Sequence, residues 1–298
     1  MQSARAGFRL RPLPLSDLLD ETFSLYRANF VVLAVTAFLV SLPSVVVSFL
    51  SGEALFGWGQ LAGSLRGSGP SAGAVTLTPA LSAWAGVNVI VGLIMVPFTA
   101  AALFLGSADV ALGRPVAVES ILRGVLRRYF SIWVVVLIFV VGVIALLIPP
   151  LGIWLLVRWS VALPALFSEE RGPGAAAGRS WSLVGGHWWR TFGRLIVVYI
   201  VVGVLTLILG SLLGIVAGLP GLSVEMQAGF SALARVVAGS LLGPVTAIAV
   251  TLIYFDLRVR KEGIDLHQMA REAGAGGPGF PGGSTGGWSS PPPSPPPS

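Results

Sequence analysis

Long apolar stretches alternate with short polar segments along most of this chain. Six stretches contain few charged side chains and approach the roughly 20 residues that a helix needs to cross the hydrocarbon core of a bilayer. They lack the strict polar–apolar alternation of membrane-spanning strands. We therefore predict an all-α, polytopic integral membrane protein. Its transmembrane helices are expected at residues 28–50, 86–106, 130–148, 151–167, 195–218 and 235–256.

Amphipathic stretches precede the first, third and fifth of these spans. Each repeats apolar residues at helical spacing, with charged residues on much of the remaining face. We expect three helices that lie in the membrane interface. Their apolar positions are Leu15, Leu18, Leu19, Phe23, Tyr26 and Phe30; Val118, Ile121, Leu122, Val125 and Tyr129; and Ala177, Trp181, Val184 and Trp188.

The second and sixth spans share a short sequence. Residues 97–109 read PFTAAALFLGSAD, and residues 244–256 read PVTAIAVTLIYFD, with six of thirteen positions identical. One interpretation is a parallel repeat of helix hairpins, related by an axis along the membrane normal. The alternative is chance similarity within a biased alphabet.

The organisation along the chain follows from these elements. An N-terminal segment at 1–27 carries the first interfacial helix, and the membrane domain covers 28–257. A short basic segment follows at 258–272. Residues 273–298 are rich in Gly, Pro and Ser, cannot bury enough apolar area, and are expected to be disordered.

Cationic residues orient the predicted spans. Sixteen of the nineteen fall on one side, in four groups, and the positive-inside rule assigns that side to the cytoplasm. Both termini are then cytoplasmic. The groups are Arg5, Arg9, Arg11 and Arg27; Arg114, Arg123, Arg127 and Arg128; Arg171, Arg179, Arg190 and Arg194; and Arg258, Arg260, Lys261 and Arg271.

Composition narrows the class of protein and of partner. An apolar fraction of 54%, a charged fraction of 11% and a mean hydropathy of +0.85 exclude a soluble domain. The net charge of +6 is spread over four short segments, which argues against nucleic acid and favours anionic lipid headgroups as partners. One Lys against eighteen Arg is typical of GC-rich bacterial genomes, so we expect a bacterial inner-membrane protein.

Arg158 is the only ionisable residue deep inside a predicted span. A charged side chain at that depth is costly unless it finds water, an acid or carbonyl groups. Arg158 is therefore a candidate intramembrane functional residue. It either has a structural role and reaches toward the surface, or it binds a substrate or lipid headgroup in a polar cavity.

Glycines repeat at four-residue spacing in the last two spans. Gly210, Gly214 and Gly218 lie in the fifth, and Gly239 and Gly243 in the sixth. Such spacing lets two helix backbones approach closely. We expect these glycines to pack the two spans together, with dimerisation as the alternative.

Acidic residues lie at the span ends that carry the arginines. A proton or ion relay would need acids nearer the midplane, so we expect these acids to pair with neighbouring arginines. The acids are Asp109, Glu169, Glu170 and Asp256, and the expected partners include Arg128, Arg171 and Arg258.

No pattern of catalytic residues is visible. The chain has no cysteine, and its two histidines, His187 and His267, are not spaced with other metal ligands. It has neither a nucleophile elbow nor a P-loop. We therefore expect no metal, no cofactor and no enzymatic activity.

Four segments resemble a bacterial family labelled glycerophosphoryl diester phosphodiesterase membrane-domain-like. The resemblance implies a six-helix membrane module of unknown activity, without the soluble phosphodiesterase domain to which such modules are sometimes fused. No catalytic residue is therefore carried over. The segments are RPLPLSDLLDETFSLYRANF (11–30), VRWSVALPALFSEE (157–170), RSWSLVGGHWWRTFGR (179–194) and YFDLRVRKEGIDL (254–266).

Two functions remain open at this point. The first is a non-enzymatic inner-membrane module that organises or regulates lipids or membrane partners. The alternative is a permease-like transporter of an amphiphile or lipid precursor. A polar cavity around Arg158 favours transport, whereas a dry core argues against it.

Overall fold

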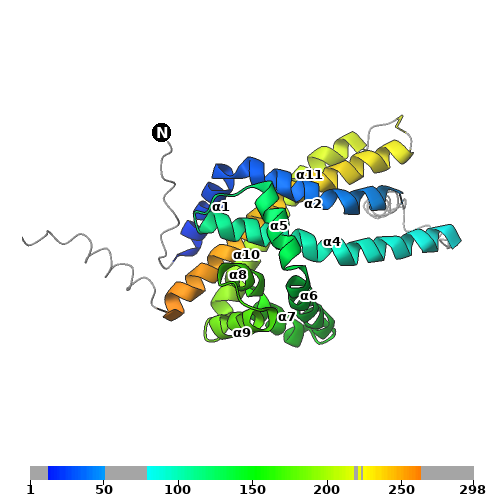
Figure 1. Cartoon of the computed structure of the whole chain (residues 1–298). Coiled ribbons are helices and arrows are strands. Elements are labelled where there is room, and N and C mark those ends of the chain that lie inside the picture. The colour runs from blue at the N-terminus through cyan, green and yellow to red at the C-terminus, as the bar shows by residue number, and fades with distance from the viewer. Residues whose placement is uncertain (1–12, 51–78, 218–220, 223, 263–298) are drawn as a thin grey trace, which may run out of the picture.

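The computed structural model describes residues 13–50, 79–217, 221–222 and 224–262. All regular secondary structure within these ranges is helical. Figure 1 shows the arrangement of the helices. The elements are α1 (Leu15–Ala28), α2 (Phe30–Leu50), α4 (Pro79–Ala111), α5 (Val118–Arg127), α6 (Tyr129–Ile144), the 3-10 turn η1 (Ala145–Leu147), α7 (Pro149–Trp159), α8 (Ala162–Ser168), α9 (Pro173–Val184), α10 (Trp188–Ala217) and α11 (Val224–Glu262).

The predicted fold class is confirmed. Within those ranges, six helical segments are long and apolar enough to cross a membrane. Each overlaps one of the six predicted stretches. The segments are Phe30–Val47, Ile90–Ala111, Tyr129–Leu147, Pro149–Ser168, Trp188–Ile215 and Val236–Glu262.

The fourth span is interrupted, although the sequence pattern predicted one helix over 151–167. Helix α7 ends at Trp159 and α8 begins at Ala162. Pro164 explains the break, because its ring clashes with the carbonyl four residues earlier, at Ser160, and it has no N–H to donate. Pro97 and Pro244, by contrast, lie inside α4 and α11.

The third and fourth spans form the tight hairpin that Pro149-Pro150 predicted. The 3-10 turn η1 joins α6 to α7, and the N–H of Gly152 donates to the carbonyl of Ile148 at 3.1 Å. A Cβ atom at Gly152 would lie 2.5 Å from the backbone nitrogen of Leu146. Glycine is therefore required for this close approach.

Helix α11 is the centre of the fold. It packs against α1, α2, α4, α8, α9 and α10, and 67% of its span is buried, against 11% for that of α10. The hydroxyls of Ser107 and Thr251 are hydrogen-bonded at 2.9 Å and join α4 to α11. The hydroxyl of Tyr26 donates to the carbonyl of Leu241 at 2.6 Å and joins α1 to α11.

Helices α1, α5 and α9 occupy the three predicted amphipathic stretches. Their apolar faces turn toward the protein: Leu18, Ile121, Val125 and Val184 are all fully buried. Helix α9 also packs against α6, α7, α8 and α11, so it is more enclosed than an interfacial helix. The position of these helices in the membrane interface stays a prediction.

The role of the repeated glycines, packing between the last two spans or dimerisation, stays a prediction. A Cβ atom added at Gly210, Gly214 or Gly239 would meet no atom of the described structure within 4 Å. Gly214 and Gly239 are exposed and face away from the hairpin. At Gly243 the added atom would lie 3.1 Å from Leu103 of α4.

The remaining predictions on organisation are affected as follows. Gly218 and the tail at 273–298 lie outside the described residues. Helix α11 continues to Glu262, so the start of the predicted basic segment 258–272 is the last turn of that helix. The repeat of helix hairpins stays a prediction.

Replacing single glycines with alanine tests this packing. We expect Gly152→Ala to destabilise the protein by about 1–3 kcal/mol, because the new methyl group meets the backbone of Leu146. The matched control Gly214→Ala is expected to be neutral or to stabilise by about 0.5–1 kcal/mol, through helix propensity alone. Thermal unfolding in detergent micelles measures both, and equal shifts would contradict the packing described here.

Candidate functional site at the arginine-rich end

Most charged side chains of the described segments gather where α1 and α10 begin and where α8 and α11 end. We call this region, together with α5 and α9, the arginine-rich end. In Figure 1 the start of α1 and the orange end of α11 lie at the same end of the molecule, and α1 packs against α11. Two ion-pair networks and two arginine-lined cavities lie here.

The first network surrounds Asp256, whose side chain is 0% exposed. Arg194 of α10 forms an ion pair with one carboxylate oxygen, and the Nε of Arg260 lies 2.9 and 3.0 Å from the two oxygens. The backbone N–H of Leu13 donates to Oδ1 at 2.7 Å. In return, Nη2 of Arg194 donates to the carbonyl of Leu13 at 2.5 Å.

This arrangement satisfies a charge that would otherwise be costly to bury. Removing one partner of a buried ion pair typically costs about 3–5 kcal/mol, because it leaves the other charge unpaired. Asp256, Arg194 and Leu13 come from three separate segments. The network therefore joins α10, α11 and the chain immediately before α1.

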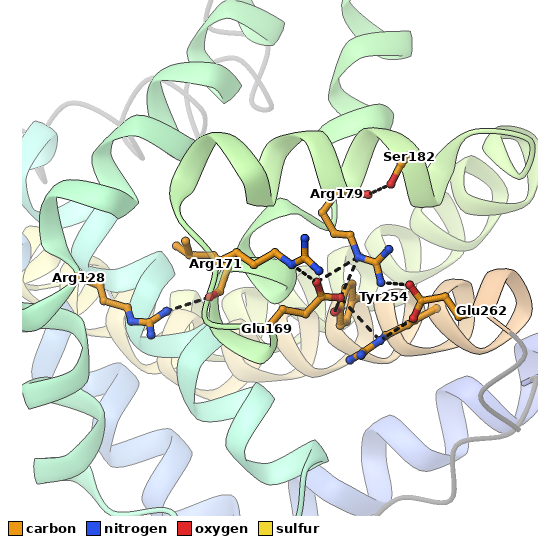
Figure 2. Close-up of polar contacts among 9 residues, drawn as sticks. Arg128, Glu169, Arg171, Arg179, Ser182, Tyr254 and Glu262 are labelled. Atoms are coloured by element: carbon orange, nitrogen blue, oxygen red, sulfur yellow. Dashed lines mark hydrogen bonds and ion pairs between the residues drawn. The ribbon is translucent and has the colours of Figure 1, made fainter. Parts of the chain in front are cut away.

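The second network surrounds Glu169, which follows α8 (Figure 2). Its carboxylate accepts hydrogen bonds from Nε of Arg179 at 2.9 and 3.1 Å and from the hydroxyl of Tyr254 at 2.6 Å. Arg171 lies 2.5 Å away and Arg258 3.7 Å away. One buried acid thus joins the α8–α9 connection to α11.

Two further contacts extend this network. Glu262 pairs with Arg179 and, at 3.0 Å, with Arg258. On the side of α5, Nη1 of Arg128 donates to the carbonyl of Leu166 at 3.0 Å, and Nη2 lies 3.8 Å from Glu170. Ends of α5, α8, α9 and α11 are therefore held together by charge.

The surroundings of Glu169 change its acidity. Burial alone raises the pKa of this carboxyl group, but the hydrogen bonds from Tyr254 and Arg179 and the charges of Arg179 and Arg258 outweigh burial. The net result is a pKa below the ordinary glutamate value. Glu169 is thus held in its charged form.

Arg158 lies in a tryptophan-rich environment at the end of α7. Its guanidinium carbon is 5.1 Å from the ring centre of Trp154 and 4.8 Å from that of Trp181. Its Nη1 donates to the carbonyl of Trp181 at 3.0 Å, whereas its Nε is buried without a hydrogen-bond partner. Cation–π contacts of this kind stabilise a partly desolvated arginine.

Arg158 and Lys261 together complete the C-terminal end of α9. The last carbonyl groups of a helix lack intrahelical donors and attract cations. Arg158 binds the carbonyl of Trp181, and Nζ of Lys261 binds those of Ser182 and, at 3.2 Å, Gly185. This geometry supports the structural interpretation of Arg158, and neither of the two cavities defined below includes it.

The pairing of span-end acids with arginines is confirmed for Glu169 with Arg171 and Arg258, and for Glu170 with Arg128. Asp109 pairs with Arg114 at 3.5 Å. Sequence reasoning missed Arg179, Arg194 and the backbone of Leu13. The one signal for these partners in the sequence is that all three residues lie on the predicted cytoplasmic side, as the buried acids do.

One cavity at this end, of about 450 Å³ at the start of α10, is lined by Gly186, His187, Trp188, Trp189 and Arg190. Two others are each lined by several arginines. The first of these, of about 340 Å³, lies between α4, α5 and α8 and is lined by Arg114, Arg127, Arg128 and Glu170 together with apolar residues. The second, of about 480 Å³, lies between the segment before α1, α10 and α11. We call the second one the arginine cavity; its lining includes Leu13, Pro14, Trp189, Arg190, Arg194 and Arg260.

The sequence predicts no metal site, and the side chains that could form one are those of His, Asp and Glu. In the part of the chain that the structure describes, no three of them come together as metal ligands. His187 lies just before α10, among aromatic residues and Arg190. His267 lies outside the described residues.

Comparison with known proteins gives no relative: no family model, no curated protein and no solved structure matches the chain. The resemblance to the phosphodiesterase membrane-domain-like family therefore stays a prediction.

The lowered pKa of Glu169 predicts how stability depends on pH. Because the folded-state pKa lies below the unfolded value of 4.5, the stabilisation by this acid is complete well above pH 4.5 and is lost as the pH falls through the folded pKa. The stability difference between the wild type and Glu169→Gln should be constant from pH 7 to about 5.5 and then shrink. Thermal unfolding of both proteins across this range measures it, and a difference that grows on acidification would contradict the network.

Proposed function

We propose that this chain is a non-enzymatic protein of the bacterial inner membrane that holds anionic lipids at its arginine-rich end, with that end and both termini in the cytoplasm. One observation carries the proposal. Each of the two arginine-lined cavities contains an arginine without an ion-pair partner among the described residues, Arg127 in one and Arg190 in the other, next to apolar side chains.

Arginine and lipid chemistry agree with this assignment. The planar guanidinium group binds phosphate oxygens through two parallel hydrogen bonds. Anionic lipids give the cytoplasmic leaflet a negative surface potential, and basic pockets near helix ends bind their headgroups. Arg127 and Arg190 are both exposed and stand at the ends of segments that can span the membrane.

The buried acids support a non-enzymatic role. A general base needs a carboxylate that can accept a proton from a substrate. Asp256 and Glu169 are instead each saturated by several arginines and by a backbone N–H or a tyrosine hydroxyl. Their charges serve to hold helices together.

The transporter alternative rests on the predicted repeat of helix hairpins, on the prolines inside the returning helices and on Arg158. The guanidinium group of Arg158 lies against Trp154 and Trp181 and donates to a helix-end carbonyl, which supports a structural role for this residue. The repeat stays a prediction, so we retain the lipid-holding function as the proposal and transport as its alternative.

Lipid-dependent stability tests this function. The protein is reconstituted in nanodiscs of phosphatidylcholine alone or with one third phosphatidylglycerol, and its thermal unfolding is compared. We expect the anionic lipid to raise Tm by at least roughly 2 °C, the shift that about 1 kcal/mol produces in a chain of this size. In the control nanodiscs, a zwitterionic lipid with acyl chains of equal length replaces phosphatidylglycerol. Equal Tm values in both nanodiscs would contradict the function.

A further inference from the structure

We infer that the arginine cavity is a binding site for one anionic phospholipid. The lipid phosphate lies at Arg190 and Arg260, and one acyl chain lies along Gly193 and Val197 of α10. The inference rests on the proposed function and gives one lipid a defined position and orientation.

The walls of the cavity are fixed before any ligand binds. Asp256 is fully buried and holds both Arg194 and Arg260. The backbone of Leu13 is bound through its N–H and its carbonyl, which places Pro14 and Leu15 at the edge of the cavity. A preformed site loses little conformational entropy on binding, which favours affinity.

The cavity carries an excess of positive charge and of hydrogen-bond donors. Arg194 and Arg260 share the carboxylate of Asp256, and Arg190 lines the same cavity without contacting that acid. Among the described residues at the cavity, three guanidinium groups therefore stand against one carboxylate. Each guanidinium group has five N–H donors. Arg194 and Arg260 use only part of theirs on Asp256 and Leu13, and Arg190 has no ion pair within the described part of the chain.

An apolar path leads from these charges along α10. Gly193 and Val197 line the cavity, and Ile200 and Val204 follow on the same face at helical spacing and are exposed. From Gly193 to Val204 the helix rises about 16 Å, close to half of the roughly 30 Å hydrocarbon core. Trp189, 78% exposed at the rim, is placed as an aromatic side chain at headgroup level.

These features distinguish the site from the first cavity. There, Glu170 adds a negative charge to the lining, Arg114 pairs with Asp109, and Arg128 lies 3.8 Å from Glu170. The described residues that line the arginine cavity include no acid. An anion with an attached hydrocarbon chain therefore fits the arginine cavity better.

Two substitutions remove different parts of the site. Gly193→Phe fills the path of the acyl chain, and an added Cβ atom there meets nothing within 4 Å, so the side chain can leave the helix without a clash at its first atom. Arg190→Gln removes the unpaired charge. The matched controls are Gly203→Phe, outside the lining of the cavity and equally without a Cβ neighbour, and Arg123→Gln, an exposed arginine paired with Glu119.

Native mass spectrometry of protein released from nanodiscs of phosphatidylglycerol and phosphatidylcholine measures retained lipid. We expect one phosphatidylglycerol on the wild type and on both controls. Its apparent Kd should rise on the order of tenfold or more in Gly193→Phe and in Arg190→Gln, because each loses part of a charge-assisted or apolar contact. A parallel arm titrates inorganic phosphate, which should bind far more weakly than the lipid.

The possible failures are distinguishable. If both variants retain phosphatidylglycerol like their controls while this lipid still raises the Tm of the wild type, the site is wrong and the proposed function stands. If Gly193→Phe alone behaves like its control, or inorganic phosphate binds as tightly as the lipid, the acyl-chain position is wrong. If the wild type neither retains phosphatidylglycerol nor gains stability from it, the proposed function and the site fail together.

Discussion

The buried carboxylate of Asp256 is the constraint on which the arginine-rich end depends. A charge with 0% exposure inside a membrane protein persists only if partners replace water. These partners come from α10, from the next turn of α11 and from the backbone of Leu13. Satisfying one charge therefore fixes three segments relative to one another. The arginine cavity is the space that these segments leave between them.

Glu169 repeats this principle on the other side of α11. Its arginines and Tyr254 join the α8–α9 connection to the central helix, while Arg158 and Lys261 hold the other end of α9. Several of the arginines from which the orientation is predicted thus also join helices to one another. Two arginines without an ion pair among the described residues, Arg127 and Arg190, line cavities, where we propose that phosphate groups bind.

The apolar spans could be predicted because a bilayer imposes length and composition on each helix separately. Long-range partners could not: Arg194 and Asp256 are 62 residues apart, and the role of Leu13 lies in its backbone. The spacing of glycines on α10 indicated one helix face without side chains. It could not indicate what that face packs against, and Gly214 is exposed. The depth of Arg158 was predicted by counting residues along one span. Such a count cannot show that the C-terminal end of α9 lies beside this residue and accepts its hydrogen bond.

A double-mutant cycle between Arg194 and Asp256 tests the central claim most directly. The free energy of unfolding in mixed micelles is measured for Arg194→Gln, Asp256→Asn and the double variant. Asp256→Asn is predicted to cost about 3–5 kcal/mol by leaving the buried Arg194 without its acid. Arg194→Gln should cost less, because Arg260 and the N–H of Leu13 still bind Asp256. The double variant should cost far less than the two losses combined, with a coupling of at least about 2 kcal/mol. Losses that simply add would contradict the claim that this pair organises the arginine-rich end.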